Sequence, residues 1–86
     1  MMEWIDILDE KKPKDRQLCL LTVPNRQNQN TVLLAHYAED LYKVDDFDFE
    51  DKEGVSGFYI CDDEWGYMEV EDVIAWAEIE PYKKEN

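Results

Sequence analysis

Two short apolar runs with a polar stretch between them restrict this chain to a fold that contains a β-hairpin. The first run covers residues 17–23 and the second covers residues 31–38. Each run is too short for a typical helix and is bounded by turn-forming residues. The intervening seven residues, Pro24 to Asn30, are polar and without periodicity, which is typical of an exposed loop. In the second strand we expect Val32, Leu34 and His36 on one face and Leu33, Ala35 and Tyr37 on the other.

The remaining apolar segments predict further strands. Residues 57–61 form the next expected strand, and Asp62-Asp63-Glu64 with Gly66 form the turn beyond it. Residues 70–79 fit either a helical or a strand face. Their β-branched content and the stop at Pro81 favour a strand, with one helical turn at 69–72 left open. The core is expected to draw on residues of these strands: Leu18, Leu20, Val32, Leu34, Phe58, Ile60, Ile74 and Trp76.

Chain length and aromatic content indicate one folded domain over residues 1–86. Eighty-six residues hold a single core, and three Trp, five Tyr and three Phe provide the large buried areas that a small core needs. The expected fold class is mainly β, with α+β left open. We expect a small, curled antiparallel sheet with at most one short helix.

Negative charge is concentrated in one half of the chain. Residues 1–38 hold five acidic and five basic residues, whereas residues 39–80 hold sixteen acidic residues and two basic ones, a net charge of −14. Direct binding to nucleic acid is disfavoured, because it requires a basic surface. Dense carboxylates could instead occupy a basic groove that normally holds nucleic acid, since duplex DNA carries about one charge per 1.7 Å of its axis. The alternative is that the acidity serves only solubility.

The acidic half also contains interleaved aromatic residues. In Asp46-Phe47-Asp48-Phe49-Glu50 an extended backbone would turn both rings inward and present three carboxylates outward, about 6.6 Å apart. Tyr42, Phe47, Phe49 and Trp65 are candidates either for apolar anchors or for the domain's own core. The candidate partner-binding residues lie in two segments on either side of one strand: Asp45, Asp46, Asp48, Glu50, Asp51, Glu53, Asp62, Asp63, Glu64 and Trp65.

No catalytic, metal or cofactor motif is found in the sequence. Counted from Asp46 as an EF-hand loop, positions six and twelve would be Asp51 and Gly57 where calcium binding needs glycine and glutamate. Cys19, His36 and Cys61 lack the close spacing of zinc ligands. Three glycines form no phosphate-binding loop. We expect a protein that is not an enzyme and that has no cofactor.

The start of the chain and the two cysteines indicate a reducing compartment. Met1-Met2-Glu3-Trp4 has neither the basic region nor the apolar region of a signal peptide, and no apolar run approaches the roughly 20 residues that span a bilayer. Cytoplasmic localisation is therefore expected. Cys19 and Cys61 lie in apolar runs, and we expect both to be free, buried thiols.

Both ends of the chain resemble one family of small domains. Trp4-Ile5 is followed by the charged turn at Lys12-Pro13, and the chain closes on Asp72-Val73-Ile74-Ala75-Trp76-Ala77-Glu78-Ile79-Glu80-Pro81. These features resemble phage and prophage domains of unknown function that open on Trp-Ile and end on a Val-x-x-Trp-x-x-Leu-x-x-Pro strand. The Leu-Pro dipeptide of their first turn is missing here. The resemblance implies a bacteriophage or mobile-element origin and a mostly β domain, and it implies no activity.

Charge placement and the phage resemblance together lead to one functional hypothesis and two rivals. The hypothesis is a phage-encoded interaction module that inhibits a basic, nucleic-acid-handling host protein by nucleic-acid mimicry, as an anti-CRISPR or anti-restriction protein does. The first rival is a structural or regulatory phage domain whose acidity only confers solubility. The second rival is a small metal protein or enzyme. A homodimer remains open in each case.

Overall fold

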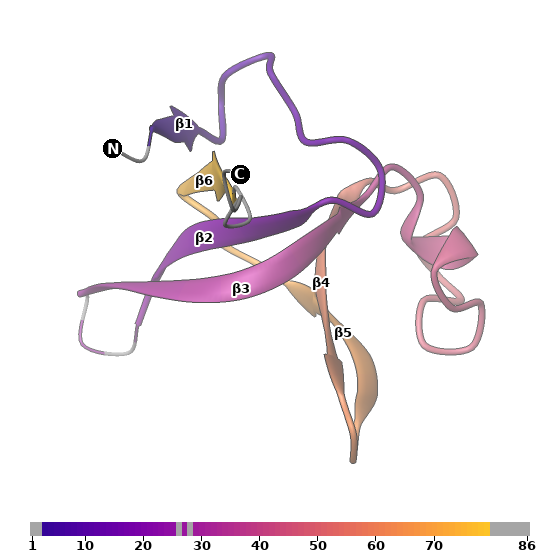
Figure 1. Ribbon diagram of the computed structural model, residues 1–86. Helices are drawn as coiled ribbons and strands as arrows, with labels where there is room; N and C mark the ends of the chain where they lie inside the picture. Colours follow the sequence, from indigo (N-terminus) through magenta and orange to yellow (C-terminus); the bar gives the residue numbers. More distant parts are fainter. Residues whose placement is uncertain (1–2, 26, 28, 80–86) are drawn as a thin grey trace, which may run out of the picture.

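A computed structural model describes residues 3–25, 27 and 29–79, which form one six-stranded antiparallel sheet (Figure 1). The strand order is β1-β6-β2-β3-β4-β5, so that the two ends of the described chain pair with each other. The expected mainly β, antiparallel fold is confirmed. The elements are β1 (Trp4–Asp6), β2 (Leu18–Pro24), β3 (Asn30–Ala38), the 3-10 helix η1 (Leu41–Lys43), β4 (Gly57–Asp62), β5 (Gly66–Val70) and β6 (Ala75–Glu78).

The predicted hairpin is present as β2 and β3. Their register runs from the pair Leu18 and His36 to the pair Pro24 and Asn30. The strands begin and end within one residue of the apolar runs that predicted them. The loop between them is closed by Asn25, whose backbone N–H donates to the Gln29 carbonyl at 2.7 Å. The Asn25 side-chain oxygen also accepts hydrogen bonds from the backbone N–H groups of Gln27 and Gln29. Asparagine side chains commonly form such bonds in turns.

The face of β2 and β3 that forms the core is opposite to the predicted one. The buried side chains of β2 are Cys19, Leu21 and Val23, and we call their side of the sheet the inner face. Leu18, Val32 and Leu34, which were expected in the core, are exposed on the outer face, and Ile74 is exposed in the turn before β6. Leu20 and Ile60 are half-buried, whereas Phe58 and Trp76 are buried as expected. Both faces of β2 and β3 carry apolar residues, so alternation alone could not select the buried one.

Curling of the sheet brings inner-face residues from distant strands into one core. Trp76 from β6 and Phe58 from β4 belong to the same buried cluster as Leu21. Tyr37 and Phe58 pair across β3 and β4, with ring centroids 5.2 Å apart in an edge-on arrangement. In Figure 1 the β4–β5 hairpin runs across the direction of β2 and β3. Such a bend lets a single sheet enclose its own apolar face.

The C-terminal part of the chain differs from the prediction in two ways. Residues 66–70 form an additional strand, β5, that pairs with β4 and was not expected. No helical turn occurs at 69–72; Asp72 has a positive φ of 60°, which turns the chain back toward β1 and β2. The strand expected over residues 70–79 is confirmed only for β6, which lies between β1 and β2. Pro81, expected to end that strand, lies outside the described residues.

Candidate acidic interface

In the segment between β3 and β4, aspartate side chains accept hydrogen bonds from the backbone of the same segment. Asp40 Oδ1 accepts hydrogen bonds from the backbone N–H groups of Tyr42 (3.1 Å) and Gly54 (2.9 Å), which fixes the start of η1 and draws the far end of the loop toward it. Asp45 Oδ1 accepts from Phe47 and Asp48 at 2.9 and 3.1 Å. A short carboxylate that bonds the backbone two residues ahead stabilises a turn. These aspartates therefore stabilise the conformation of the loop in addition to giving it negative charge.

Residues 46–50 form successive turns and not the extended segment that the alternating pattern predicts. Phe49 is buried against Leu41 and Tyr59 in a second, smaller core cluster. Phe47, also expected to point inward, is 83% exposed. In a turn, residues i and i+2 do not share a face as they do in a strand, so the two rings diverge. The loop thus has one ring as its anchor and one ring free to contact a partner.

Asp48 joins the two acidic segments of the chain. Its Oδ2 accepts the backbone N–H of Tyr67, at the start of β5, at 2.9 Å. Gly66 is required beside it: its φ is +78°, and a Cβ at this position would lie 2.6 Å from Asp48 Oδ2. Asp48 is therefore half-buried and bonded, which corrects the prediction that it points outward with Asp46 and Glu50. The bond places the loop beside the β4–β5 hairpin.

An ion pair makes a second connection between the loop and β5. Lys52 Nζ lies 3.1 Å from Glu69 Oε1, and this hydrogen bond raises the pKa of the Lys52 ammonium. Lys52 is one of the two basic residues in the acidic half of the chain. Because Lys52 is paired with Glu69, Lys43 is the other lysine of this half that can offset the neighbouring carboxylates.

The predicted turn between β4 and β5 is confirmed and carries the second acidic segment. Asp62 Oδ1 accepts the backbone N–H groups of Glu64 and Trp65, at 2.7 and 3.1 Å. Trp65 is 73% exposed at this turn. A large apolar ring held on a short, bonded turn is the kind of side chain that dominates protein interfaces.

The predicted partner-binding residues divide into two groups by exposure. Asp45, Asp48 and Asp62 are half-buried and bond backbone N–H groups. The others are exposed, and we call them, together with the exposed ring of Phe47, the acidic face: Asp46, Glu50, Asp51, Glu53, Asp63, Glu64 and Trp65. Phe47 was named only as a candidate anchor or core ring. Its exposure follows from the Asp45-x-Phe47 turn, a pattern that is visible in the sequence.

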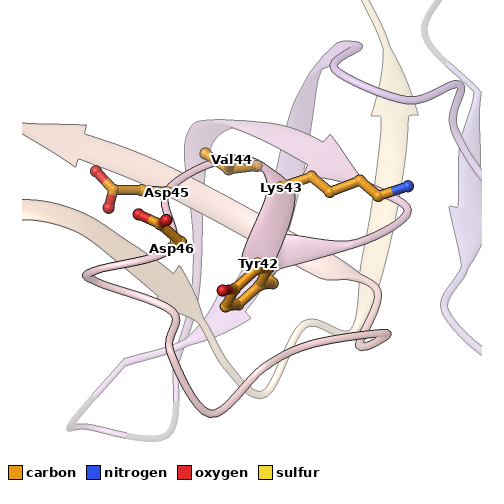
Figure 2. A pocket seen from close by; sticks show the side chains of 5 residues that line it. All are labelled: Tyr42, Lys43, Val44, Asp45 and Asp46. Carbon is orange, nitrogen blue, oxygen red and sulfur yellow. The ribbon is translucent and has the colours of Figure 1, made fainter.

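A shallow pocket of about 460 Å³ lies near the start of the segment between β3 and β4 (Figure 2). Its lining residues are Tyr42, Lys43, Val44, Asp45 and Asp46. Figure 2 shows the Asp45 and Asp46 carboxylates close together, with the Lys43 side chain extending in the opposite direction. Two carboxylates and a nearby phenol ring could receive a lysine or arginine side chain, through charge and ring stacking. The sequence did not single out Tyr42 to Val44 as pocket residues.

The histidine and the cysteines do not form a reactive or metal-binding site in the described structure. His36 stacks on Tyr59 on the outer face, with ring centroids 5.6 Å apart, while Cys19 lies on the inner face. Within residues 3–25, 27 and 29–79, no cluster of three His, Cys, Asp or Glu side chains could hold a metal ion. No helix in this part of the chain is long and apolar enough to span a membrane.

Both cysteines are free thiols, but their environments differ. Cys19 is buried as expected, and burial, together with the Glu78 carboxylate, raises its pKa from 9.0 to about 11. Cys61 is exposed, contrary to the prediction, because its side chain lies on the outer face of β4. A thiol whose folded pKa exceeds its unfolded value stabilises the fold below pH 9, and this contribution declines as the pH rises toward 11.

A thiol titration of the native protein should count one reactive cysteine, and titration after denaturation should count two. Cys61 is accessible, whereas Cys19 must be unfolded before a reagent can reach it and form the thiolate. The measurement is the absorbance of a chromogenic disulfide reagent near neutral pH, with Cys61→Ser as the control that should lower the native count to zero. A native count of two would show that Cys19 is not protected.

Comparison with protein-family models, with curated proteins and with solved structures finds no match for this chain. The resemblance to phage and prophage domains therefore remains a prediction. Function has to be argued from the acidic face itself.

Proposed function

We propose that this protein is a phage-encoded, acidic interaction module that inhibits a basic, nucleic-acid-handling host protein by occupying its nucleic-acid site. The proposed setting is the cytoplasm of an infected or lysogenic bacterium. A CRISPR effector or a restriction enzyme is the type of target that fits. The protein acts by binding and needs neither catalysis nor a cofactor.

The Asp48–Tyr67 hydrogen bond is the observation that carries this proposal. It connects two acidic segments that are distant in the sequence, so that their carboxylates can act on one partner. Phe47 and Trp65 are exposed on the same two segments. Carboxylates in place of phosphates and rings in place of bases are the two chemical elements that a nucleic-acid groove recognises.

The expected binding energy also requires both the carboxylates and the exposed aromatic rings. An exposed ion pair contributes only about 0.2–1 kcal/mol, so that no single carboxylate can determine the affinity. A buried aromatic side chain at the centre of an interface can contribute about 2 kcal/mol or more. We therefore assign the association rate and salt dependence to the carboxylates, and slow dissociation to Phe47 and Trp65.

Capture from a bacterial lysate tests the proposal directly. The immobilised protein is expected to retain basic nucleic-acid-binding proteins at ~0.05 M salt and to release them at ~1 M, where charges are screened beyond about 3 Å. Excess duplex DNA should displace the captured protein, because both ligands would occupy one site. Retention that DNA cannot displace would contradict mimicry, and the absence of any salt-sensitive partner would favour a purely solubilising acidity.

A further inference from the structure

Phe47 and Trp65 are presented in the same way on two different turns. The backbone N–H of Phe47 donates to Asp45 Oδ1 at 2.9 Å, and the backbone N–H of Trp65 donates to Asp62 Oδ1 at 3.1 Å. In both turns an aspartate side chain thus holds the residue that carries the ring. The rings themselves are 83% and 73% exposed, and neither belongs to a core cluster. Fixing the backbone beneath an exposed ring lowers the entropy that is lost on binding.

An exposed carboxylate stands immediately before each ring in the sequence. Asp46 precedes Phe47 and Glu64 precedes Trp65, and both carboxylates belong to the acidic face. The Asp48–Tyr67 hydrogen bond joins the two turns, one residue after Phe47 and two residues after Trp65. The fold therefore brings together two units that each consist of one negative charge and one flat ring. A nucleotide of a nucleic acid strand has the same composition, with one charged phosphate and one base.

The chemistry of the two rings distinguishes a single strand from a duplex. In duplex DNA the base faces are stacked on one another, and a protein reads the hydrogen-bonding edges of the bases in the grooves. The Phe47 ring has no hydrogen-bonding group, so it cannot imitate a base edge. Phe47 and Trp65 offer open aromatic faces instead. Open base faces are found in single strands, where they stack on aromatic or arginine side chains of the binding protein.

We propose that the acidic face imitates single-stranded nucleic acid, and that its partner is a basic protein whose groove binds a single strand by stacking. This inference rests on the proposed function and narrows it to one class of target. The carboxylates of Asp46 and Glu64 take the place of phosphates, and Phe47 and Trp65 take the place of unstacked bases. A groove of this class combines positive charge with aromatic side chains and accepts many sequences, because every base has a π-face. The same tolerance allows two protein rings to replace two bases.

Competitors that differ in the accessibility of their bases test the inference on the unmodified protein. Proteins captured from a bacterial lysate on the immobilised chain are displaced at equal phosphate concentrations by single-stranded oligothymidylate, by an abasic strand of the same length, or by a duplex. Oligothymidylate should release the captured protein at a concentration at least about tenfold lower than either of the others, since it alone offers both phosphates and open base faces. The duplex should act only in larger excess, through its phosphates.

Substitutions of the two rings test the same point from the side of the chain. Phe47→Leu and Trp65→Leu keep an apolar side chain but remove the flat ring, and each should weaken binding of the purified captured protein at least about fivefold, the lower end of what one stacked base contributes. Phe47→Tyr and Trp65→Tyr are the matched controls, because they keep an aromatic face and should bind nearly as tightly as the parent. Surface plasmon resonance gives the dissociation constants. Far-UV circular dichroism should show an unchanged fold, since both rings are largely exposed.

Two results would overturn the inference and leave the proposed function intact. The duplex or the abasic strand could displace the captured protein at the same concentration as oligothymidylate, which would show that open base faces are not recognised. Alternatively, Phe47→Leu and Trp65→Leu could bind as tightly as the two tyrosine substitutions, so that the rings would be ordinary apolar contacts. Capture that none of the three competitors reverses, or the absence of any captured protein, would instead contradict the proposed function and this inference together.

Discussion

Replacement of Trp76 with alanine is expected to destabilise the fold by about 3–5 kcal/mol, the range observed when a large buried side chain is removed from a core. Trp76 is 2% exposed and belongs to the inner-face cluster that joins β6 to β2 and β4. A small domain has only about 5–15 kcal/mol of stability, and self-repulsion of the acidic half lowers this value. Urea denaturation followed by far-UV circular dichroism should show a large decrease in the midpoint, or an unfolded variant.

Trp76→Phe provides the matched comparison. The Trp76 indole N–H is buried and has no hydrogen-bond partner among the described residues. An unsatisfied buried donor costs about 1–3 kcal/mol, so that loss of this group should partly offset the volume lost with the second ring. Phenylalanine should therefore cost much less than alanine. Equal midpoints for the parent and Trp76→Ala would contradict the placement of this residue in the core.

Reversal of three carboxylates on the acidic face to lysine is expected to abolish capture of the basic partner. The variant combines Asp46→Lys, Glu50→Lys and Asp63→Lys, each of which is exposed. Asp48 is excluded because its carboxylate holds the Tyr67 N–H, so that its loss would disturb the loop as well as the charge. Folding should survive, since relief of repulsion among neighbouring acidic residues offsets lost contacts. Retention of the captured protein at ~0.15 M salt is the readout, at a screening length of about 8 Å.

The control for this variant reverses three exposed acidic residues outside the two acidic segments: Glu3, Glu10 and Glu71. Both triple variants change the net charge from −13 to −7, two units for each of three substitutions. The control should still bind, because in the proposed mechanism the local placement of the carboxylates, and not the total charge, determines recognition. Equal loss in both variants would show that only the overall field matters. Unchanged binding by the first variant would leave solubility as the role of the acidic residues.

The hairpins could be predicted from the sequence because their signals are local. Apolar runs bounded by polar turns located β2, β3 and β4 to within about one residue, and Asp62 to Gly66 marked the next turn. β5 was not recognised because Gly66 to Val70 contains Glu69, which breaks the apolar run, and because the contact of Glu69 with Lys52 joins residues that are distant in the sequence. That contact depends on tertiary structure, which no local pattern contains.

The choice of buried face could not be predicted for a different reason. Leu18 and Leu20 are as apolar as Cys19 and Leu21, so that either face of β2 could have formed the core. The decision depends on Trp76 and Phe58, which the curled sheet brings to one side. The same ambiguity in the sequence is what leaves Leu18, Val32 and Leu34 exposed on the outer face.

The structure places the predicted partner-binding residues in two turn segments, and not all of them are free to face a partner. Asp45 and Asp62 were expected to face a partner, and both instead accept backbone hydrogen bonds two and three residues ahead. Aspartate immediately before a turn commonly forms such bonds, so this part of the outcome was contained in the sequence. The contact between Asp48 and Tyr67 was not, because nineteen residues separate its partners.

The position of β6 between β1 and β2 has a consequence for how the chain folds. The β2–β3 and β4–β5 hairpins join residues that are close in sequence, and such pairs form within about 1–10 μs. β6 must then find Ile5 on one side and Leu21 on the other, with the pair Ile5 and Trp76 separated by most of the chain. Closing so long a loop costs more entropy than closing a hairpin and tends to come late. Until β6 is in place, β1 has no partner strand and one edge of β2 is unpaired. The pairing of β6, the last of these six strands in chain order, therefore controls when the sheet becomes protected from proteolysis and from edge-to-edge aggregation.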